Sequence, residues 1–104
     1  MKKVAVYPGT FDPITYGHID VIKKSLKLFE RIVIAVSDGA NKNYLFNSDE
    51  RIEIIKKALF KDQKLNKSKI EIISFHDGFM LWLRHAMLLD CSIKVAYSLS
   101  RSQQ

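Results

Sequence analysis

The chain has 104 residues, of which 47% are hydrophobic, and a formal net charge of +6 at pH 7. This length suits one small domain, residues 1–104, with a single core. No apolar run approaches the roughly 20 residues that span a bilayer, and the basic start leads into a strand pattern instead of a signal-peptide region, so we expect neither a membrane span nor a secretory leader.

The distribution of lysines and the single cysteine limit the ligands and metal sites that we expect. The lysines are dispersed and are not gathered with aromatic residues, so most belong to solvated helix faces and nucleic acid is not an expected partner. A moderate positive field would still attract polyanionic small molecules. The single cysteine, Cys91, cannot form an internal disulfide, and no Cys/His cluster has zinc spacing. We therefore expect a cytoplasmic protein without a metal site of its own.

The hydrophobic pattern predicts alternating strands and helices along the chain. Asn47, with Glu50 three residues later, is typical of a capping box and marks the start of the second helix. In chain order, the expected elements are a strand at 3–7, a helix at 18–29, a strand at 31–36, a helix from 47 through 59, a charged turn at 61–68, a strand at 69–75, a helix at 79–89 and a strand at 92–97. This order predicts an α/β fold with a Rossmann-like, doubly wound parallel sheet that binds ligands at the carboxyl ends of its strands.

The run from 7 to 18, Tyr-Pro-Gly-Thr-Phe-Asp-Pro-Ile-Thr-Tyr-Gly-His, lies between the first predicted strand and helix. Pro8 and Gly9 are expected to turn the chain sharply off the strand, and a glycine lets a ligand approach the backbone closely. Thr10 adds a hydroxyl group. Gly17 and His18 open the helical pattern, so the imidazole and the free helix N–H groups would face the same anion. The run therefore predicts a phosphate site.

Thr-Phe-Asp-Pro followed by Thr-x-Gly-His resembles the T/HxGH signature of the nucleotidylyltransferase superfamily, whose members bind ATP phosphates on a Rossmann-like sheet. The complete run, continued by Ile-Asp, is similar to that of the bacterial phosphopantetheine adenylyltransferase family. These enzymes join 4′-phosphopantetheine to the AMP part of ATP in coenzyme A synthesis and release pyrophosphate. The resemblance implies ATP and 4′-phosphopantetheine as ligands, Mg²⁺ carried with ATP, and a hexamer.

The resemblance also implies roles for five side chains. His18 would stabilise the transition state at the α-phosphate, and Thr10 would contact both substrates. Phe11 would lie beside the nucleotide through its backbone, Lys42 would bind the phosphopantetheine phosphate, and Met80 would contact the pantetheine arm. Each residue also has a structural interpretation: a helix cap or surface histidine, a turn threonine, a core phenylalanine, a solvated lysine and a core methionine.

Two further expectations concern Arg51, from the family resemblance, and the loops at the sheet edge, from the predicted topology. Arg51 follows Glu50 in the order of the family's Glu-Arg pair, for which a structural ion pair is the favoured interpretation. The three loops at 10–18, around Lys42 and at 75–80 each follow the carboxyl end of a strand, so we expect them to converge on one pocket.

The resemblance is strong over residues 1–80 and weak over 81–104, where the family's Arg-Gly-Leu-Arg loop is missing. We therefore expect a sheet cut short at its carboxyl-terminal end, by truncation or divergence. Two alternatives to phosphopantetheine adenylyl transfer stay open. One is a catalytically impaired remnant that still binds nucleotide or pantetheine, and the other is a nucleotidylyltransferase with another small substrate.

Overall fold

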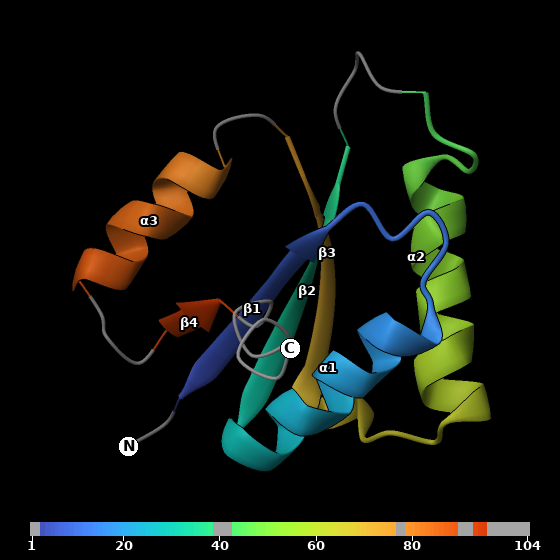
Figure 1. The fold of residues 1–104 in the computed structure, drawn as a ribbon, viewed down its shortest axis with the longest axis horizontal. Coiled ribbons are helices and arrows are strands. Elements are labelled where there is room, and N and C mark those ends of the chain that lie inside the picture. Colours follow the sequence, from blue (N-terminus) through green and yellow to red (C-terminus); the bar gives the residue numbers. More distant parts are fainter. Residues whose placement is uncertain (1–2, 39–42, 77–78, 90–92, 96–104) are drawn as a thin grey trace.

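The computed structural model describes residues 3–38, 43–76, 79–89 and 93–95 (Figure 1). Its elements in chain order are β1 (Val4–Gly9), α1 (Tyr16–Leu28), β2 (Arg31–Ser37), α2 (Ser48–Lys56), the π-helical turn η1 (Lys57–Asp62), the 3₁₀ turn η2 (Lys67–Lys69), β3 (Ile70–Phe75), α3 (Phe79–Leu89) and β4 (Ile93–Val95). Within these ranges, no helix has both the length and the apolar character needed to cross a bilayer.

The strands form one parallel sheet in the order β3-β2-β1-β4. In Figure 1, α1 and α2 cover one face of this sheet and α3 lies on the other. The connections thus run outward from β1 to β3 on one side and return to the opposite side of β1 for β4, which places a change of winding direction next to β1. The predicted doubly wound α/β fold is confirmed.

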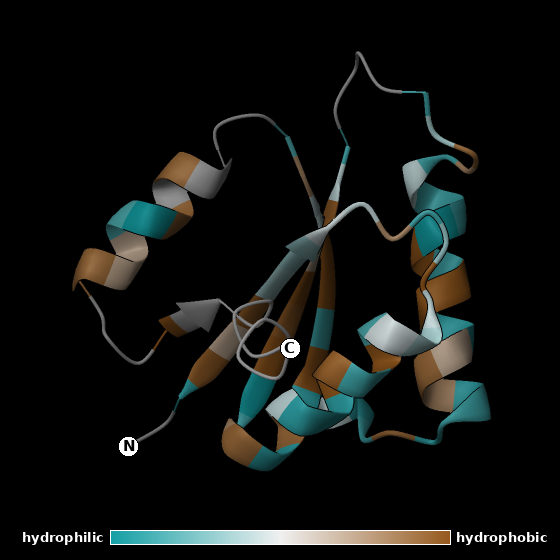
Figure 2. Cartoon of the chain, viewed as in Figure 1, coloured by the Kyte–Doolittle hydropathy of each residue, from teal (hydrophilic) through white to brown (hydrophobic). Residues whose placement is uncertain are grey.

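Alternating side chains of the strands divide the core between the two faces of the sheet. The larger cluster contains the β2 residues Ile32, Ile34 and Val36. They pack with Ile55 of α2 and Leu59 of η1. On the other side, Ala35 packs in a smaller cluster with Leu83 of α3. Figure 2 shows mainly brown along β2 and β3, as expected for strands of a parallel sheet covered on both faces.

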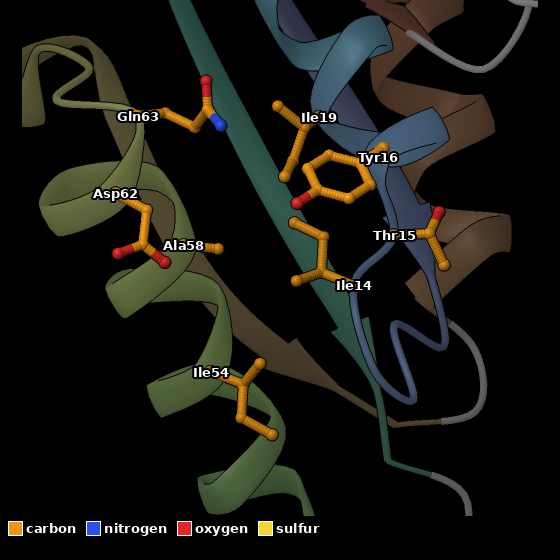
Figure 3. Close-up of a pocket in the computed structure, with 8 residues that line it drawn as sticks. All are labelled: Ile14, Thr15, Tyr16, Ile19, Ile54, Ala58, Asp62 and Gln63. Carbon is orange, nitrogen blue, oxygen red and sulfur yellow. The ribbon is translucent and has the colours of Figure 1, made fainter.

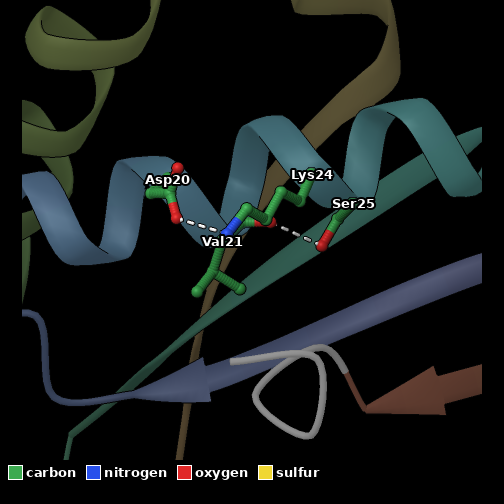
Figure 4. A network of polar contacts seen from close by, with 4 residues as sticks. All are labelled: Asp20, Val21, Lys24 and Ser25. Carbon is green, nitrogen blue, oxygen red and sulfur yellow. Dashed lines mark hydrogen bonds and ion pairs between the residues drawn. The ribbon is translucent and has the colours of Figure 1, made fainter. Parts of the chain in front are cut away.

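Helix α1 begins two residues earlier than predicted, at Tyr16, because Thr15 is its N-cap. Farther along, the buried Ser25 donates its hydroxyl hydrogen to the carbonyl of Val21 at 2.8 Å, which satisfies a polar group inside the core (Figure 4). On the exposed surface of α1, Lys24 Nζ forms an ion pair with Asp20 Oδ2, one helical turn earlier, at 2.9 Å. Such an exposed pair adds little stability, so packing holds the helix in place.

The predicted turn at Pro8 and Gly9 is wrong. Both residues continue β1 and pair with Ala35 and Val36 of β2. The chain leaves the strand at Phe11, which has a positive φ of 50°, and it continues through a cis Asp12-Pro13 bond. Phe11 folds back over the end of the strand, and a Cβ atom on Gly9 would lie 3.0 Å from its Cε2. Gly9 therefore makes room for a phenylalanine ring where we expected it to make room for a ligand.

The Gly9 contact predicts an overpacking penalty. Gly9→Ala should lower the free energy of unfolding by about 1–3 kcal/mol, because the new methyl group meets the buried ring of Phe11. Urea denaturation followed by circular dichroism measures the change. Gly17→Ala is the matched control: its Cβ would lie 3.6 Å from the nearest atom, Thr15 Oγ1, and alanine favours the helix. Equal destabilisation by both substitutions would contradict the packing argument.

Candidate functional site

The candidate site lies where β1, β2 and β3 end. Thr10 follows β1, Ser37 is the last residue of β2, and Phe75 is the last residue of β3. The Asp38 N–H donates to the carbonyl of Phe75 at 2.9 Å, which joins the ends of β2 and β3. The described parts of the predicted loops thus meet at one edge of the sheet, where doubly wound folds bind their ligands.

A reciprocal cap holds His18 at the third position of α1. The Thr15 hydroxyl accepts from the His18 backbone N–H at 3.3 Å, while the Thr15 backbone N–H donates to His18 Nδ1 at 3.0 Å. A backbone N–H can only donate, so Nδ1 must accept and carries no proton. The neutral ring therefore holds its proton on Nε2. Glutamate or glutamine usually fills this position of a capping box, and here the imidazole replaces it.

The His18 ring also packs against two aromatic side chains. Its centroid lies 4.7 Å from that of Phe11 and 6.0 Å from that of Tyr7. Burial among these groups lowers the pKa of His18 below its ordinary value of 6.5, so the ring is neutral at pH 7. The cap and the packing together give a neutral imidazole of fixed orientation that can donate a hydrogen bond from Nε2 to an anionic oxygen.

The other predicted site residues differ in exposure and in their contacts. Thr10 is exposed at the end of β1, as a ligand contact requires. Phe11 is 2% exposed, so its ring belongs to the core, and a backbone contact with nucleotide stays a prediction. Lys42 lies outside the described residues. Met80 lies in the first turn of α3, and its side chain is not among those that the structure describes.

Asp12 ties the loop after β1 to the segment before α2. One carboxylate oxygen accepts from the Leu45 N–H and the other accepts from the Phe46 N–H. Both oxygens are therefore engaged with backbone donors, which makes Asp12 a structural clamp of the site.

The expected ion pair of Arg51 with Glu50 is wrong. Glu50 completes the capping box of α2, accepting from the Asn47 N–H at 3.2 Å. Arg51 is instead fully buried and donates to backbone carbonyls of three separate segments. The sequence carries a signal for this burial, because Arg51 precedes Ile55 and Leu59 at the four-residue spacing of the buried helix stripe.

A separate hollow of about 270 Å³ lies between the start of α1 and the segment from α2 to η1 (Figure 3). Tyr16 and Ile19 project toward Ala58 across this hollow, whereas Thr15 projects to the other side of the loop. Neither Thr10 nor His18 lines it. The hollow is therefore distinct from the predicted phosphate site.

A parallel sheet in the order β3-β2-β1-β4, with helices on both faces, defines a Rossmann-like α/β domain. The cytidylyltransferase-like family matches residues 6–97, and the chain belongs to this family. Among curated proteins, it is 76% identical over 75 residues to the phosphopantetheine adenylyltransferase of Pelagibacter ubique (strain HTCC1062), covering 72% of this chain and 46% of the relative. It is 42% identical over 94 residues to the protein of that name from Francisella philomiragia, covering 90% and 49%. The chain spans about half the length of these relatives.

Solved structures agree on the fold. The nicotinic acid mononucleotide adenylyltransferase of Plasmodium falciparum complexed with NaAD has a TM-score of 0.67 at 24% identity, covering 91% of this chain and 50% of its own. A bifunctional NMN adenylyltransferase/ADP ribose pyrophosphatase from Francisella tularensis has a TM-score of 0.68 at 20% identity, covering 83% and 26%. At such low identities, these likenesses concern the fold alone.

The lowered pKa of His18 predicts a pH dependence of stability. The unfolded chain takes up the His18 proton near pH 6.5, whereas the folded chain resists it until a lower pH. The contribution of His18 is therefore complete above the unfolded pKa and is lost as pH falls through the folded pKa. Protonated Nδ1 also ceases to accept from the Thr15 N–H.

His18→Gln provides the matched comparison, because glutamine keeps a capping-box acceptor but does not titrate. The wild-type stability minus that of His18→Gln should decrease as pH is lowered from about 7.5 to about 5, measured by urea denaturation across the series. A difference that is independent of pH would contradict the assigned burial and cap of His18.

Proposed function

We propose that the site carries out adenylyl transfer from ATP to 4′-phosphopantetheine, giving dephospho-coenzyme A and pyrophosphate, in the cytoplasm. A phosphate oxygen of the acceptor attacks the α-phosphorus of ATP, a new P–O bond forms, and the bond to the departing pyrophosphate breaks. The observation that supports this most strongly is the capped His18, whose Nε2 is left as a hydrogen-bond donor at the carboxyl edge of the sheet.

Positioning and charge stabilisation are the main tasks in this reaction, since little covalent chemistry falls to the protein. His18 Nε2–H would donate to an α-phosphate oxygen as negative charge builds there. The first turn of α1 also has N–H groups without intrahelical acceptors, and a helix start of this kind favours an anion. Thr10 would place its hydroxyl between the two substrates, and Lys42 and Met80 would contact the phosphate and the arm of the acceptor.

Magnesium fits this site as a companion of ATP. Within the part of the chain that the structure describes, no three His, Cys, Asp or Glu side chains are grouped so as to hold a metal ion. Asp12, the acidic side chain of the loop after β1, has both oxygens engaged by backbone N–H groups. Mg²⁺ commonly binds through substrate phosphates and water, and it would neutralise charge on the triphosphate here.

The choice of acceptor follows the relatives. Curated proteins up to 76% identical carry the name phosphopantetheine adenylyltransferase. The solved neighbours named for nicotinic acid mononucleotide or NMN are 20–24% identical, so they concern the fold and do not bear on the choice of acceptor. The second alternative, a remnant that binds without turnover, is motivated by the absence of the family's Arg-Gly-Leu-Arg pattern from residues 81–104.

Pyrophosphate release with ATP, Mg²⁺ and either 4′-phosphopantetheine or nicotinic acid mononucleotide separates these possibilities, alongside a calorimetric titration of each ligand. Release that requires 4′-phosphopantetheine supports the proposal. Release with nicotinic acid mononucleotide alone would show that this mononucleotide is the acceptor. Ligand binding without turnover would show that the chain is a catalytically impaired remnant.

His18→Ala should reduce the turnover of the chain by roughly 10²–10³-fold, the usual effect of losing one donor to a developing anion. The variant should stay folded, because His18 lies in the first turn of α1 and is only partly buried, and circular dichroism checks this. Steady-state pyrophosphate release measures the turnover. A variant that turns over as fast as the parent would remove His18 from the mechanism.

A further inference from the structure

Arg51 is a fully buried arginine, with 0% of its surface exposed, beneath the candidate phosphate site. Its Nη1 donates to the carbonyls of Thr10 at 2.9 Å and Ser37 at 2.7 Å, and its Nε donates to the carbonyl of Phe46 at 3.0 Å. The guanidinium thus joins the ends of β1 and β2 to the segment that enters α2.

The charge of this guanidinium has no carboxylate partner among the described residues. Nη2 is buried without a hydrogen-bond acceptor, and the Tyr44 ring, whose centroid lies 4.0 Å from Cζ, covers the guanidinium. Carbonyl dipoles and an aromatic face offset part of the desolvation cost but supply no full negative charge. A buried cation without a counter-charge is costly, so its environment favours the arrival of an anion.

The position of Arg51 indicates where that anion binds. The Thr10 carbonyl that it contacts belongs to the residue expected between the two phosphorylated substrates. Asp12, in the same loop, directs its carboxylate to the N–H groups of Leu45 and Phe46. An anion bound in front of Thr10 would therefore be separated from the guanidinium by the Thr10 backbone, where water screens their attraction less than at an open surface.

We propose that Arg51 is a positioning residue whose buried positive charge strengthens phosphate binding at the Thr10 edge, with the phosphates of the ligand as its counter-charge. The proposal rests on the proposed function for the location of the anion. It differs from a purely structural role, in which the guanidinium would only connect three backbone segments.

Three variants separate charge from structure, with inorganic pyrophosphate as the calorimetric probe. Arg51→Met removes the charge and should weaken pyrophosphate binding about 10- to 30-fold. Arg51→Lys keeps the charge but loses the fork, and it should bind within about threefold of the parent. Arg31→Met is the control: it removes the same charge at the opposite end of β2, from an exposed ion pair with Glu71, and should bind like the parent.

Equal weakening by Arg51→Lys and Arg51→Met would overturn the charge proposal and leave the structural role. So would parent-like binding by Arg51→Met. If the unmodified chain binds no pyrophosphate, the anion site itself is absent, and both this inference and the proposed function are wrong.

If Arg51→Met does not fold, NMR of the unmodified chain tests whether the charge of Arg51 contributes to phosphate binding. The Nε–Hε group of Arg51 is buried and hydrogen-bonded to Phe46, so its NMR signal should be protected from exchange. Saturating pyrophosphate should shift this signal and leave that of Arg31 in place. An Arg51 signal that stays unchanged while the Thr10 and His18 amide signals move would overturn the proposal.

Discussion

The hydrogen bond from the Thr15 backbone N–H to His18 Nδ1 is the constraint on which the site depends. Through this hydrogen bond, the helix cap fixes both the orientation and the tautomer of the imidazole. Phe11 and Tyr7 hold the same ring from the side and exclude water from part of it. Helix initiation and the proposed chemistry therefore depend on one set of contacts, so the proposed donor is in place before any ligand arrives.

A second set of contacts holds the surrounding loops. Asp12 binds the backbone ahead of α2, and Arg51 reaches back from α2 to the ends of β1 and β2. The two side chains carry opposite charges, yet each is directed to backbone groups. The loops are thus held by partly buried hydrogen bonds, while we propose that the positive charge of Arg51 serves an anionic ligand.

The sequence predicts the fold well because apolar runs and helical spacing repeat clearly along the chain. It also indicates the phosphate loop, since Thr10, Gly17 and His18 lie in one motif. It could not reveal that Gly9 accommodates the ring of Phe11, because that contact depends on a positive φ two residues later. The role of Arg51 was also missed, because a polar residue on a buried helix stripe reveals its partners only when distant loops are brought together. The predicted domain extent, the hexamer and the contacts of Lys42 and Met80 stay predictions.

The proposed chemistry requires the cap to present a neutral His18 with its proton on Nε2. Nitrogen-15 NMR of the imidazole at pH 7.5 reports this state, because long-range correlations connect the carbon-bound ring hydrogens to both nitrogens. We expect an unprotonated Nδ1 and a protonated Nε2 in the free chain. A ring protonated on Nδ1, or one that averages between both tautomers like free imidazole, would contradict it.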